Sequence, residues 1–557
     1  MELSWFKKGT IYQIYPRSFN DSNGDGIGDL RGIIEKLDYL QSLHVDILWL
    51  SPIFSSPNDD NGYDISDYCA IMPEFGTMKD FDELLKKTHE RGMRLILDLV
   101  ANHCSDEHIW FKEAKKSKDN PYRDYFHWRK PSSNGGPPNN WKSFFGGSAW
   151  EYDETSGEYY LHLFTKKQPD LNWENPKVRE EMYDAMRFWL DKGVDGFRMD
   201  VIPLISKREG YPDAPGFGFR KVIEEVYANG PRVHEYLKEM TEKVVSQYDA
   251  FSLAEGVGIN HENAGLYIDN DRKELNMLYH FDILECTIVN GKFEEVSPFD
   301  LVNMKGIFKK WRDAVHKKGW IANAMGNHDF ARMVSRFGED KEHWAASAKM
   351  LFIMQATQNG TLNIYQGDEI GMTNIELESI DEVRDIQSLN FYNENLKTKR
   401  YSKELALKMI NNEGRDNART PIQWNDEING GFTTIKKEPW IKVNPNYNTI
   451  NVKKQDDDPV SILNFYRNLL KTRKQHDVFV YGDFEELEFN NPEIYAYKKK
   501  FKEEEIIVIL NFKNVTLDFK IPYNLSDVEP LLNNYEVLEM NNNVMNLKPY
   551  QGVIFKI

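Results

Sequence analysis

Residues 192–202 read KGVDGFRMDVI, an apolar run interrupted by glycine that carries Arg198 and Asp200 near its far end. Because side chains alternate between the two faces of a β-strand, Arg198 and Asp200 are predicted to project to the same side. A positive charge within a few Å lowers the pKa of a carboxyl group, so the arginine would keep Asp200 ionised. An ionised, positioned carboxylate can act as a nucleophile. Such a pair can also be purely structural, and this motif alone leaves both interpretations open.

The rest of the chain alternates short apolar runs with amphipathic segments. Eight runs have the length of β-strands: TIYQIYP, VDILWLSP, RLILDLVANH, GVDGFRMDV, AFSLAEG, LNMLYHFD, WIANAMGNHD and TLNIYQGDE. Between them, segments such as 30–43, 81–92, 176–193 and 235–248 have apolar residues three and four apart, which is the helical spacing. The alternation predicts an α/β protein, a (β/α)8 TIM barrel with insertions.

Polar residues gather at the ends of the predicted strands, where the active site of such a barrel lies. They are Asp98, Asn102 and His103 after the third strand, Arg198 and Asp200 after the fourth, Glu255 after the fifth, Asn327, His328 and Asp329 after the seventh, and Asp368 and Glu369 after the eighth.

Three domains are expected. The barrel would comprise residues 1–103 and 175–478. Residues 104–174 are rich in Trp, Tyr, Gly, Pro and Asn, and the segment is too long for a plain strand-to-helix loop, so we expect an inserted, loop-rich subdomain after the third strand. Residues 479–557 read as strands and turns, which predicts a C-terminal antiparallel β-sandwich domain.

Asp200, Glu255 and Asp329 together indicate the chemistry. Hydrolysis of a glycosidic bond needs one ionised carboxyl group to attack or assist and one protonated group to donate to the leaving oxygen. Asp200 beside Arg198 suits the first role. Glu255 lies in the mostly apolar stretch FSLAEGVG and suits the second, because desolvation raises the pKa of a carboxyl group. Without distances, a retaining and an inverting mechanism both stay open.

Five motifs, DLVANH, GFRMD, the Glu255 stretch, NHD and QPDLN (168–172), resemble the signature regions of glycoside hydrolase family 13, in particular its oligo-1,6-glucosidase and α-glucosidase branch. The resemblance covers essentially the whole chain. It implies a retaining mechanism with Asp200 as nucleophile, Glu255 as acid/base and Asp329 as transition-state stabiliser. It also implies the substrate-binding residues Asp60, Tyr63, His103, Arg198, His328, Glu369 and Arg415, with Glu369 at the leaving sugar.

The implied function is that of an exo-acting α-glucosidase, which releases glucose from the non-reducing ends of short oligosaccharides or disaccharides such as isomaltose, isomaltulose, sucrose or maltose. Val201 resembles the residue of α-1,6-acting members. A sucrose isomerase or transglucosylase is an alternative, but no RLDRD-like loop follows Phe281, where the chain reads DILECTIVNG. Trehalose-6-phosphate hydrolase would need a basic phosphate pocket that the sequence does not reveal. A non-catalytic relative is disfavoured because all three carboxylates are present.

Two departures from the family pattern concern the leaving-group side. Relatives usually have Pro two residues after the Asp of NHD, whereas this chain has Phe330 and then Ala331 before Arg332. Residues 202–204, Ile-Pro-Leu, stand where many relatives have a small or polar residue. Both changes bear on linkage and acceptor preference more than on the reaction itself.

The stretch DSNGDGIGD places oxygen ligands at alternating positions, with glycines for tight turning, which suits a hard cation. The expected ligands are Asp21, Asn23, Asp25, Ile27 and Asp29. The EF-hand frame is missing, and an Asp/Gly turn is the structural alternative, but the resemblance implies a structural Ca²⁺ or Mg²⁺ ion. No organic cofactor is expected.

Composition bounds the partners and the compartment. The formal net charge of −18 argues against nucleic acid and anionic membranes and favours a small neutral sugar as partner. The N-terminal segment lacks the order of a secretory signal, and no run reaches membrane-spanning length. Cys69, Cys104 and Cys286 are widely spaced, as in a reducing compartment. We therefore expect a cytoplasmic protein, a monomer or weak homo-oligomer.

Overall fold

Eight parallel strands form the central sheet, in the order β11-β10-β9-β5-β2-β1-β13-β12. They are β1 (Thr10–Ile14), β2 (Ile47–Leu50), β5 (Arg94–Val100), β9 (Gly196–Asp200), β10 (Phe251–Gly256), β11 (Met277–His280), β12 (Ala322–Ala324) and β13 (Thr361–Tyr365). An isolated parallel bridge between Leu278 and Ile321 links the two outer strands of this sheet. Every strand falls within one of the eight predicted runs, which confirms the (β/α)8 barrel. The computed structural model describes residues 4–557 apart from 217, 289–292, 294–296, 316–317, 524, 526–527 and 542.

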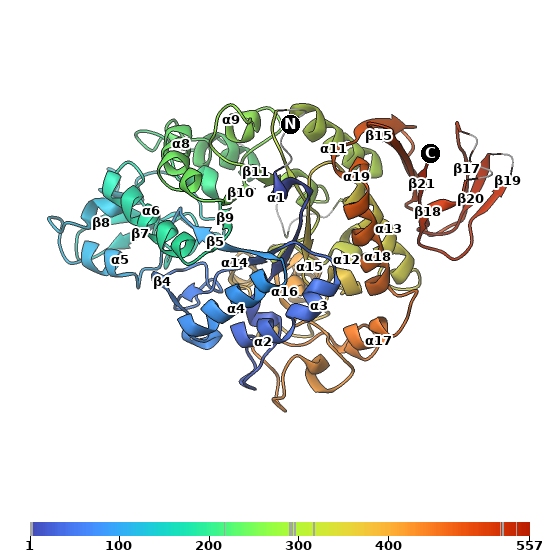
Figure 1. Cartoon of the computed structure of the whole chain (residues 1–557). Helices are drawn as coiled ribbons and strands as arrows, with labels where there is room; N and C mark the ends of the chain where they lie inside the picture. The colour runs from blue at the N-terminus through green and yellow to red at the C-terminus, as the bar shows by residue number, and fades with distance from the viewer. Residues whose placement is uncertain are drawn as a thin grey trace.

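Helices cover the outside of the barrel (Figure 1). They include α2 (Leu30–Glu35), α3 (Leu37–Ser42), α4 (Met78–Glu90), α6 (Pro176–Asp191), α8 (Val233–Lys243), α11 (Leu301–Val315), α13 (Trp344–Thr357) and α18 (Ile462–Gln475). The first residue of α6 is Pro176, and the side chain of Asn175 accepts a hydrogen bond from Lys177 N at its N-terminus. A proline has no N–H to lose in the first turn, which explains why the helix starts there.

Further helices lie in the connections. They are α1 (Trp5–Lys8), α7 (Phe219–Val222), α9 (Gly265–Ile268), α10 (Phe281–Leu284), α12 (Met333–Phe337), α14 (Ile386–Thr398), α15 (Lys403–Glu413), α16 (Asp416–Arg419), α17 (Val452–Asp456) and α19 (Val478–Tyr481). The connection from β13 to α18 contains α14 to α17 and carries Arg415 and Arg419 towards the barrel axis. A two-stranded ribbon of β3 (Phe54–Ser55) and β4 (Asp67–Ile71) follows β2 and holds Asp60 and Tyr63 in its loop.

The inserted segment after β5 forms its own small sheet. Helix α5 (Ile109–Ala114) precedes the antiparallel strands β6 (Trp128–Arg129), β7 (Trp150–Asp153) and β8 (Glu158–Leu161), which are ordered β6-β8-β7. In Figure 1 this part lies at the left edge of the barrel, opposite the C-terminal strands. Its aromatics form a buried cluster with residues of the barrel loops, among them Trp141, Trp150 and Val201. Most of these rings therefore pack the interior of the insertion.

The C-terminal part consists of two antiparallel sheets. The larger has the order β14-β15-β16-β21-β18 and the smaller the order β17-β20-β19. The strands are β14 (Asp483–Leu487), β15 (Ile494–Phe501), β16 (Glu504–Asn511), β17 (Leu517–Lys520), β18 (Pro530–Asn533), β19 (Glu539–Asn541), β20 (Val544–Leu547) and β21 (Gly552–Lys556). A shared apolar cluster, including Ile507 and Met545, lies between them. Among the residues described, no helix combines the length and the apolar character needed to cross a bilayer.

Candidate active site

The end of β9 carries an unusual turn. Val201 adopts the left-handed conformation with φ 35° and ψ 35°, which a β-branched residue rarely takes because its side chain crowds the backbone. In this conformation the backbone N–H of Val201 donates a hydrogen bond to Glu255 Oε2 at 2.9 Å. The turn after Asp200 therefore holds the carboxylate of the next strand beside it, and strain of this kind is often found at functional sites.

Arg198 lies fully buried among three carboxyl groups. Its Nη1 is 2.7 Å from Asp98 Oδ1 and 2.9 Å from Asp200 Oδ1, and its Nη2 is 2.5 Å from Glu255 Oε1. The hydroxyl of Tyr279 accepts from the same guanidinium at 2.8 Å and donates to Glu255 Oε1 at 2.9 Å. We call these four charged residues, Asp98, Arg198, Asp200 and Glu255, the carboxyl cluster. One cation thus fixes three acids.

The protonation of the carboxyl cluster follows from this imbalance. Burial raises the pKa of Asp98 to about 6, although Arg198 opposes the shift. Burial also raises the pKa of Asp200 well above its ordinary value, again against Arg198 and with the help of the negative charges of Glu255 and Asp98. The expectation that Arg198 would dominate is corrected, because desolvation and like charges outweigh it. In such a coupled group the retained proton belongs to the group as a whole.

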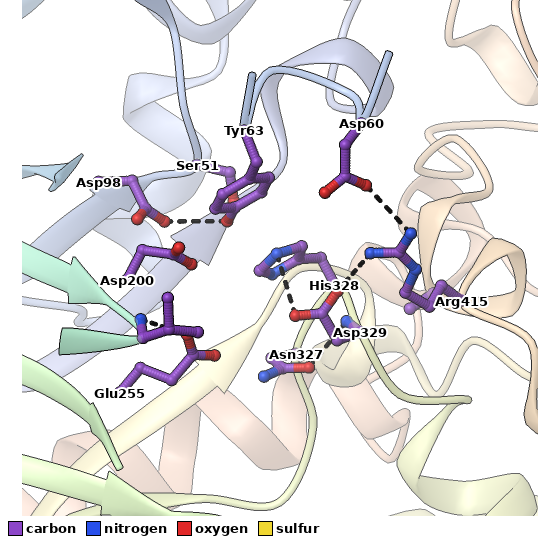
Figure 2. A network of polar contacts seen from close by, with 12 residues as sticks. Ser51, Asp60, Tyr63, Asp98, Asp200, Glu255, Asn327, His328, Asp329 and Arg415 are labelled. Atoms are coloured by element: carbon purple, nitrogen blue, oxygen red, sulfur yellow. Dashed lines mark hydrogen bonds and ion pairs between the residues drawn. The ribbon is translucent and has the colours of Figure 1, made fainter. Parts of the chain in front are cut away.

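A second group of polar side chains faces the carboxyl cluster across the barrel mouth (Figure 2). His328 Nε2 lies 3.4 Å from Asp329 Oδ2. The other oxygen of Asp329 lies 3.4 Å from Arg415 Nη1 and 3.2 Å from Arg419 Nη2. The Asn327 amide oxygen accepts the backbone N–H of Asp329 at 2.8 Å. Two arginines and a histidine therefore orient the third predicted carboxylate, Asp329.

A buried ion pair lies on the side of this group away from the carboxyl cluster (Figure 2). Arg415 Nη2 lies 3.1 Å from Asp60 Oδ1, and Arg415 Nε lies 2.7 Å from Asp385 Oδ1. The amide nitrogen of Gln168 is 3.2 Å from Asp60 Oδ2 and 3.3 Å from His103 Nε2. Gln168, from the QPDLN motif, thus joins two of the predicted sugar-binding residues.

A second buried ion pair lies near His103, and Asn102 connects the two, since its amide nitrogen is 3.3 Å from His103 Nδ1. Lys207 Nζ lies 2.7 Å from Asp170 Oδ2 and donates to Asn102 Oδ1 at 2.7 Å. Asn102 donates its amide N–H to Asp170 Oδ2 at 3.0 Å. Burial lowers the pKa of His103 to about 4, so the ring is neutral near pH 7. The pair connects the loop after β5, the end of the insertion and the loop after β9.

The structure thus brings together nine predicted site residues: Asp60, Tyr63, His103, Arg198, Asp200, Glu255, His328, Asp329 and Arg415. Tyr63 joins them by donating its hydroxyl to Asp98 Oδ2 at 3.0 Å. Glu369 is the exception. Its carboxylate accepts from the hydroxyls of Tyr12 and Tyr39, both at 2.7 Å. These tyrosines tie β1 to α3 on the outer side of the barrel wall, so Glu369 supports the fold, and its expected contact with a leaving sugar is corrected.

The expected surroundings of Glu255 also need correction. Leu253 and Ala254 beside it are apolar, but the Glu255 carboxylate itself meets the Arg198 guanidinium, the Tyr279 hydroxyl and the Val201 N–H. The stretch FSLAEGVG contains only the neighbours of Glu255 along the chain. The groups that face a strand residue come from neighbouring strands, and the local sequence does not contain them.

Both departures from the family pattern are buried, Ala331 in the loop after β12 and Ile202–Leu204 in a 3-10 helix after β9. Phe330 is buried and its ring meets that of Phe281 edge-on at 5.8 Å. Arg332 is fully buried and donates to backbone carbonyls of Gln366 and Ala418 at 2.6 and 3.1 Å, so it braces the barrel. The DILECTIVNG loop that follows Phe281 lies partly outside the described residues.

The predicted metal loop is a tight turn. Gly24 and Gly26 have φ angles of 79° and 94°. Asp21 accepts the N–H groups of Asn23, Gly24 and Gly26 at 2.7–3.0 Å, and Asp29 accepts the Gly32 N–H at the start of α2. In the described part of the chain, no three His, Cys, Asp or Glu side chains gather closely enough to hold a metal by themselves. Both carboxylate oxygens of Asp21 accept two hydrogen bonds each, since Oδ2 also accepts from the Thr433 hydroxyl, so a cation would have to share these oxygens with their donors.

Sequence reasoning missed five residues that complete the site: Gln13, Ser51, Gln168, Asp385 and Arg419. Gln13 carried a signal, since it is a polar residue in the middle of the apolar strand TIYQI. Gln168 stood in a quoted motif without a role. Asp385 and Arg419 belong to the long connection after β13, where no strand or helix period predicts the direction of a side chain.

Comparison with known proteins agrees with this geometry. Residues 13–482 match the family described as alpha amylase, catalytic domain. An oligo-1,6-glucosidase from Parageobacillus thermoglucosidasius is 51% identical over 562 aligned residues, which cover 100% of both chains. A trehalose-6-phosphate hydrolase from Bacillus subtilis (strain 168) is 46% identical over 561 residues, covering 100% of this chain and 99% of that one.

Solved structures give the same result. The trehalulose synthase MutB from Pseudomonas mesoacidophila MX-45 superimposes with a TM-score of 0.95 at 44% identity, covering 99% of each chain. The isomaltulose synthase PalI from Klebsiella sp. LX3 superimposes with a TM-score of 0.96 at 41% identity, covering 100% of each chain. By sequence and by fold, this chain belongs to the alpha-amylase family of glycoside hydrolases, family 13.

Proposed function

We propose that the protein is an exo-acting, retaining α-glucosidase that removes the non-reducing terminal glucose from short α-glucosides, with α-1,6-linked isomaltose as the preferred type. The observation that carries the proposal is the shared arginine, because Arg198 binds both Asp200 and Glu255, on neighbouring strands, across from Asp329. The buried Asp60–Arg415 pair supports exo action, since it lies on the side of the site away from the carboxyl cluster. A substrate chain that continued in this direction would have to displace the pair.

In each step of the mechanism, each carboxyl group has one role. Asp200 attacks the anomeric carbon while Glu255 donates a proton to the leaving oxygen, and a covalent glucosyl-enzyme forms. Glu255, now ionised, takes a proton from water, which releases glucose and regenerates Asp200. Asp329 and His328 form hydrogen bonds to ring hydroxyls, and these bonds strengthen as the sugar flattens in the transition state. The single proton kept by the carboxyl cluster is the one that the acid step requires.

The direct test is Asp200→Asn. The amide keeps the shape of the side chain and a hydrogen bond to Arg198 but removes the nucleophile, so hydrolysis of p-nitrophenyl α-glucoside should fall roughly 10⁴-fold or more. Circular dichroism and the melting temperature should stay near those of the wild type. Retained activity in a folded Asp200→Asn variant would rule out this mechanism. Asp153→Asn, at a buried carboxyl group on β7 of the insertion, is the matched control.

Product analysis separates the alternatives within the enzyme class. Isomaltose, maltose, sucrose and trehalose 6-phosphate are offered separately, and products are resolved by chromatography. Glucose from isomaltose supports the leading proposal. Isomeric disaccharides from sucrose would favour the synthase activity named for the MutB and PalI structures. Arg220, the basic residue beside Phe281, already pairs with Asp282 and Glu285, which argues against a phosphate ligand there.

We also propose a structural Ca²⁺ or Mg²⁺ ion on the loop of Asp21, Asn23, Asp25, Ile27 and Asp29, supported by the spacing of its oxygens. Metal analysis of chelator-free protein should find about one divalent ion per chain, and chelator should lower the melting temperature. An unchanged melting temperature with no bound ion would end this proposal.

The three cysteines are unpaired, which supports a cytoplasmic location, and a monomer or weak homo-oligomer is the expected assembly.

A further inference from the structure

Gln13 points from β1 into the barrel and is fully buried. Its amide nitrogen lies 2.9 Å from His328 Nδ1 and 3.2 Å from Ser51 Oγ. An amide nitrogen only donates, and in a neutral imidazole one ring nitrogen donates while the other accepts. Nδ1 of His328 must then be the acceptor, which leaves the ring proton on Nε2.

The other end of the His328 ring gives the same answer independently. Nε2 lies 3.4 Å from Asp329 Oδ2, and an ionised carboxylate only accepts. If the Gln13 amide were turned round, its oxygen would face Nδ1 and require the proton there. Nε2 would then carry no proton and would face the Asp329 carboxylate, so that two hydrogen-bond acceptors would meet. The Asp329 contact therefore selects the orientation in which Gln13 donates to Nδ1.

The ring has little freedom to escape this arrangement. The Tyr63 ring stacks on one face of His328 at 5.2 Å with planes 1° apart, and the Tyr15 ring stacks at 5.9 Å with planes 19° apart. Burial lowers the pKa of His328 to about 3, against the opposing charge of Asp329 and with a smaller contribution from Arg419. The ring is therefore neutral throughout the working range of pH, and the choice between its two tautomers is the chemical variable that remains.

We propose that Gln13 is a positioning residue that holds His328 as the Nε2–H tautomer, so that His328 and Asp329 offer one donor and one acceptor to the same sugar hydroxyl. A hydroxyl donates one hydrogen bond and accepts others, so it can donate to Asp329 while it accepts from His328 Nε2–H. The opposite tautomer would present two acceptors and lose one bond. The nature of the ligand rests on the proposed function, whereas the tautomer is a property of the free protein.

The first experiment reads the tautomer directly. The protein is labelled with ¹⁵N-histidine, and the His328 signals among the 13 histidines are assigned by their loss in His328→Asn. The wild type should show a neutral ring protonated at Nε2 from pH 5 to pH 8. In Gln13→Glu, the new carboxylate accepts and should draw a proton onto Nδ1. A wild-type ring protonated at Nδ1, or a Gln13→Glu spectrum identical to wild type, would overturn the proposal.

The second experiment reads the consequence in catalysis. Gln13→Met keeps the volume but cannot donate, and kcat/KM for p-nitrophenyl α-glucoside should fall roughly tenfold, the usual effect of one hydrogen bond. The same comparison is repeated with p-nitrophenyl α-glucosides that each lack one ring hydroxyl. The loss should disappear for the one analogue whose missing hydroxyl is the partner of His328. Equal losses on every analogue would mean that Gln13 only supports the fold and would overturn the proposal.

Gln355→Met is the matched control. Gln355 is also buried, but it donates to the backbone carbonyls of Asn323 and Asn363. Its loss should lower the melting temperature and leave both the His328 spectrum and kcat/KM unchanged. If the wild type itself proves inactive on α-glucosides, the proposed function fails, while the spectrum still decides the role of Gln13.

Discussion

Arg198 binds three buried carboxyl groups although it bears a single positive charge. It contacts Asp98, Asp200 and Glu255 at 2.5–2.9 Å. Three buried acids around one cation are one negative charge in excess if one acid keeps its proton, and two in excess if none does. Since buried excess charge is costly, the group keeps a proton near neutral pH. The same residues thereby provide an ionised nucleophile and a proton donor.

Asp98→Asn tests this charge balance. The negative charge of Asp98 helps to raise the pKa of Asp200, so its removal should lower that pKa. The carboxyl cluster would then give up its protons at lower pH, and both limbs of the kcat/KM profile should move towards acid. The measurement is the pH dependence of p-nitrophenyl α-glucoside hydrolysis. Asp153→Asn should leave the limbs in place, and an unmoved profile in Asp98→Asn would contradict the idea of a shared proton.

At the residue scale, strand alternation predicted most of the site. Arg198, Asp200 and Glu255 lie on the neighbouring strands β9 and β10, so a period of two along each strand was enough to bring them together, whereas Asp329 lies in the turn five residues beyond β12. The prediction for Glu369 was wrong because this residue lies beyond β13 in a short 3-10 helix (Asp368–Ile370). In such a helix, successive side chains are rotated by about 120° around the axis, so a period of two does not apply.

Among the elements, β9 depends on an exceptionally close approach to β10. Gly196 has φ 148°, and a Cβ atom there would lie 2.2 Å from the carbonyl oxygen of Phe251. Both features exclude any other residue without movement of the backbone. Because Arg198 and Asp200 stand two and four residues further along, such a movement would displace the nucleophile.

Gly196→Ala should therefore reduce both stability and activity. We expect a loss of about 3 kcal/mol in the free energy of unfolding and a fall in kcat/KM beyond that explained by unfolded protein. Gly193→Ala is the control from the same stretch. Its φ of 101° is also unfavourable for alanine, but its Cβ would meet only Leu85 and His89 at 3.8 and 3.9 Å. Chemical denaturation and kinetics on both variants make the comparison. Equal effects of the two substitutions would show that backbone strain alone, and not the contact with β10, causes the losses.

The elements of the barrel were predictable because each strand is an apolar run and each outer helix has one apolar face. Breaks within elements were not. Residues 30–43 have one helical pattern, yet Lys36, with φ −104° and ψ 7°, separates α2 from α3. The three-stranded sheet of the insertion was also missed, because its strands are two to four residues long and its aromatics pack against loops that are distant in sequence.

At the scale of the whole molecule, buried lysines fasten the C-terminal strands to the barrel. Lys305 on α11 donates to the carbonyls of Asn491 and Ile494, both at 2.7 Å. Lys499 on β15 reaches back to the carbonyls of Thr357 and Phe479 at 2.7 and 2.6 Å. Each buried ammonium satisfies carbonyls that would otherwise have lost water without compensation. The domain is therefore held by polar bonds as well as by apolar packing.

Lys305→Met tests this attachment. Removing the donor leaves buried carbonyls unpaired, which should cost about 2 to 4 kcal/mol of unfolding free energy and expose the C-terminal strands to limited proteolysis. The kcat/KM value should not change, because Lys305 lies outside the site. Lys309→Met is the control on the same helix, since Lys309 forms an i,i+4 pair with Asp313 at the surface and should matter little.

The pH dependence of this effect has a defined sign. Burial lowers the pKa of Lys305 from 10.5 to about 8. Between these values the unfolded chain binds a proton that the folded protein does not, so stability contributed by this group rises with pH. Below about pH 8 the folded protein bears the full cost of the buried charge. The gap in unfolding free energy between wild type and Lys305→Met should therefore widen from pH 7 to pH 10, and parallel stability curves would show that Lys305 titrates as an ordinary exposed lysine.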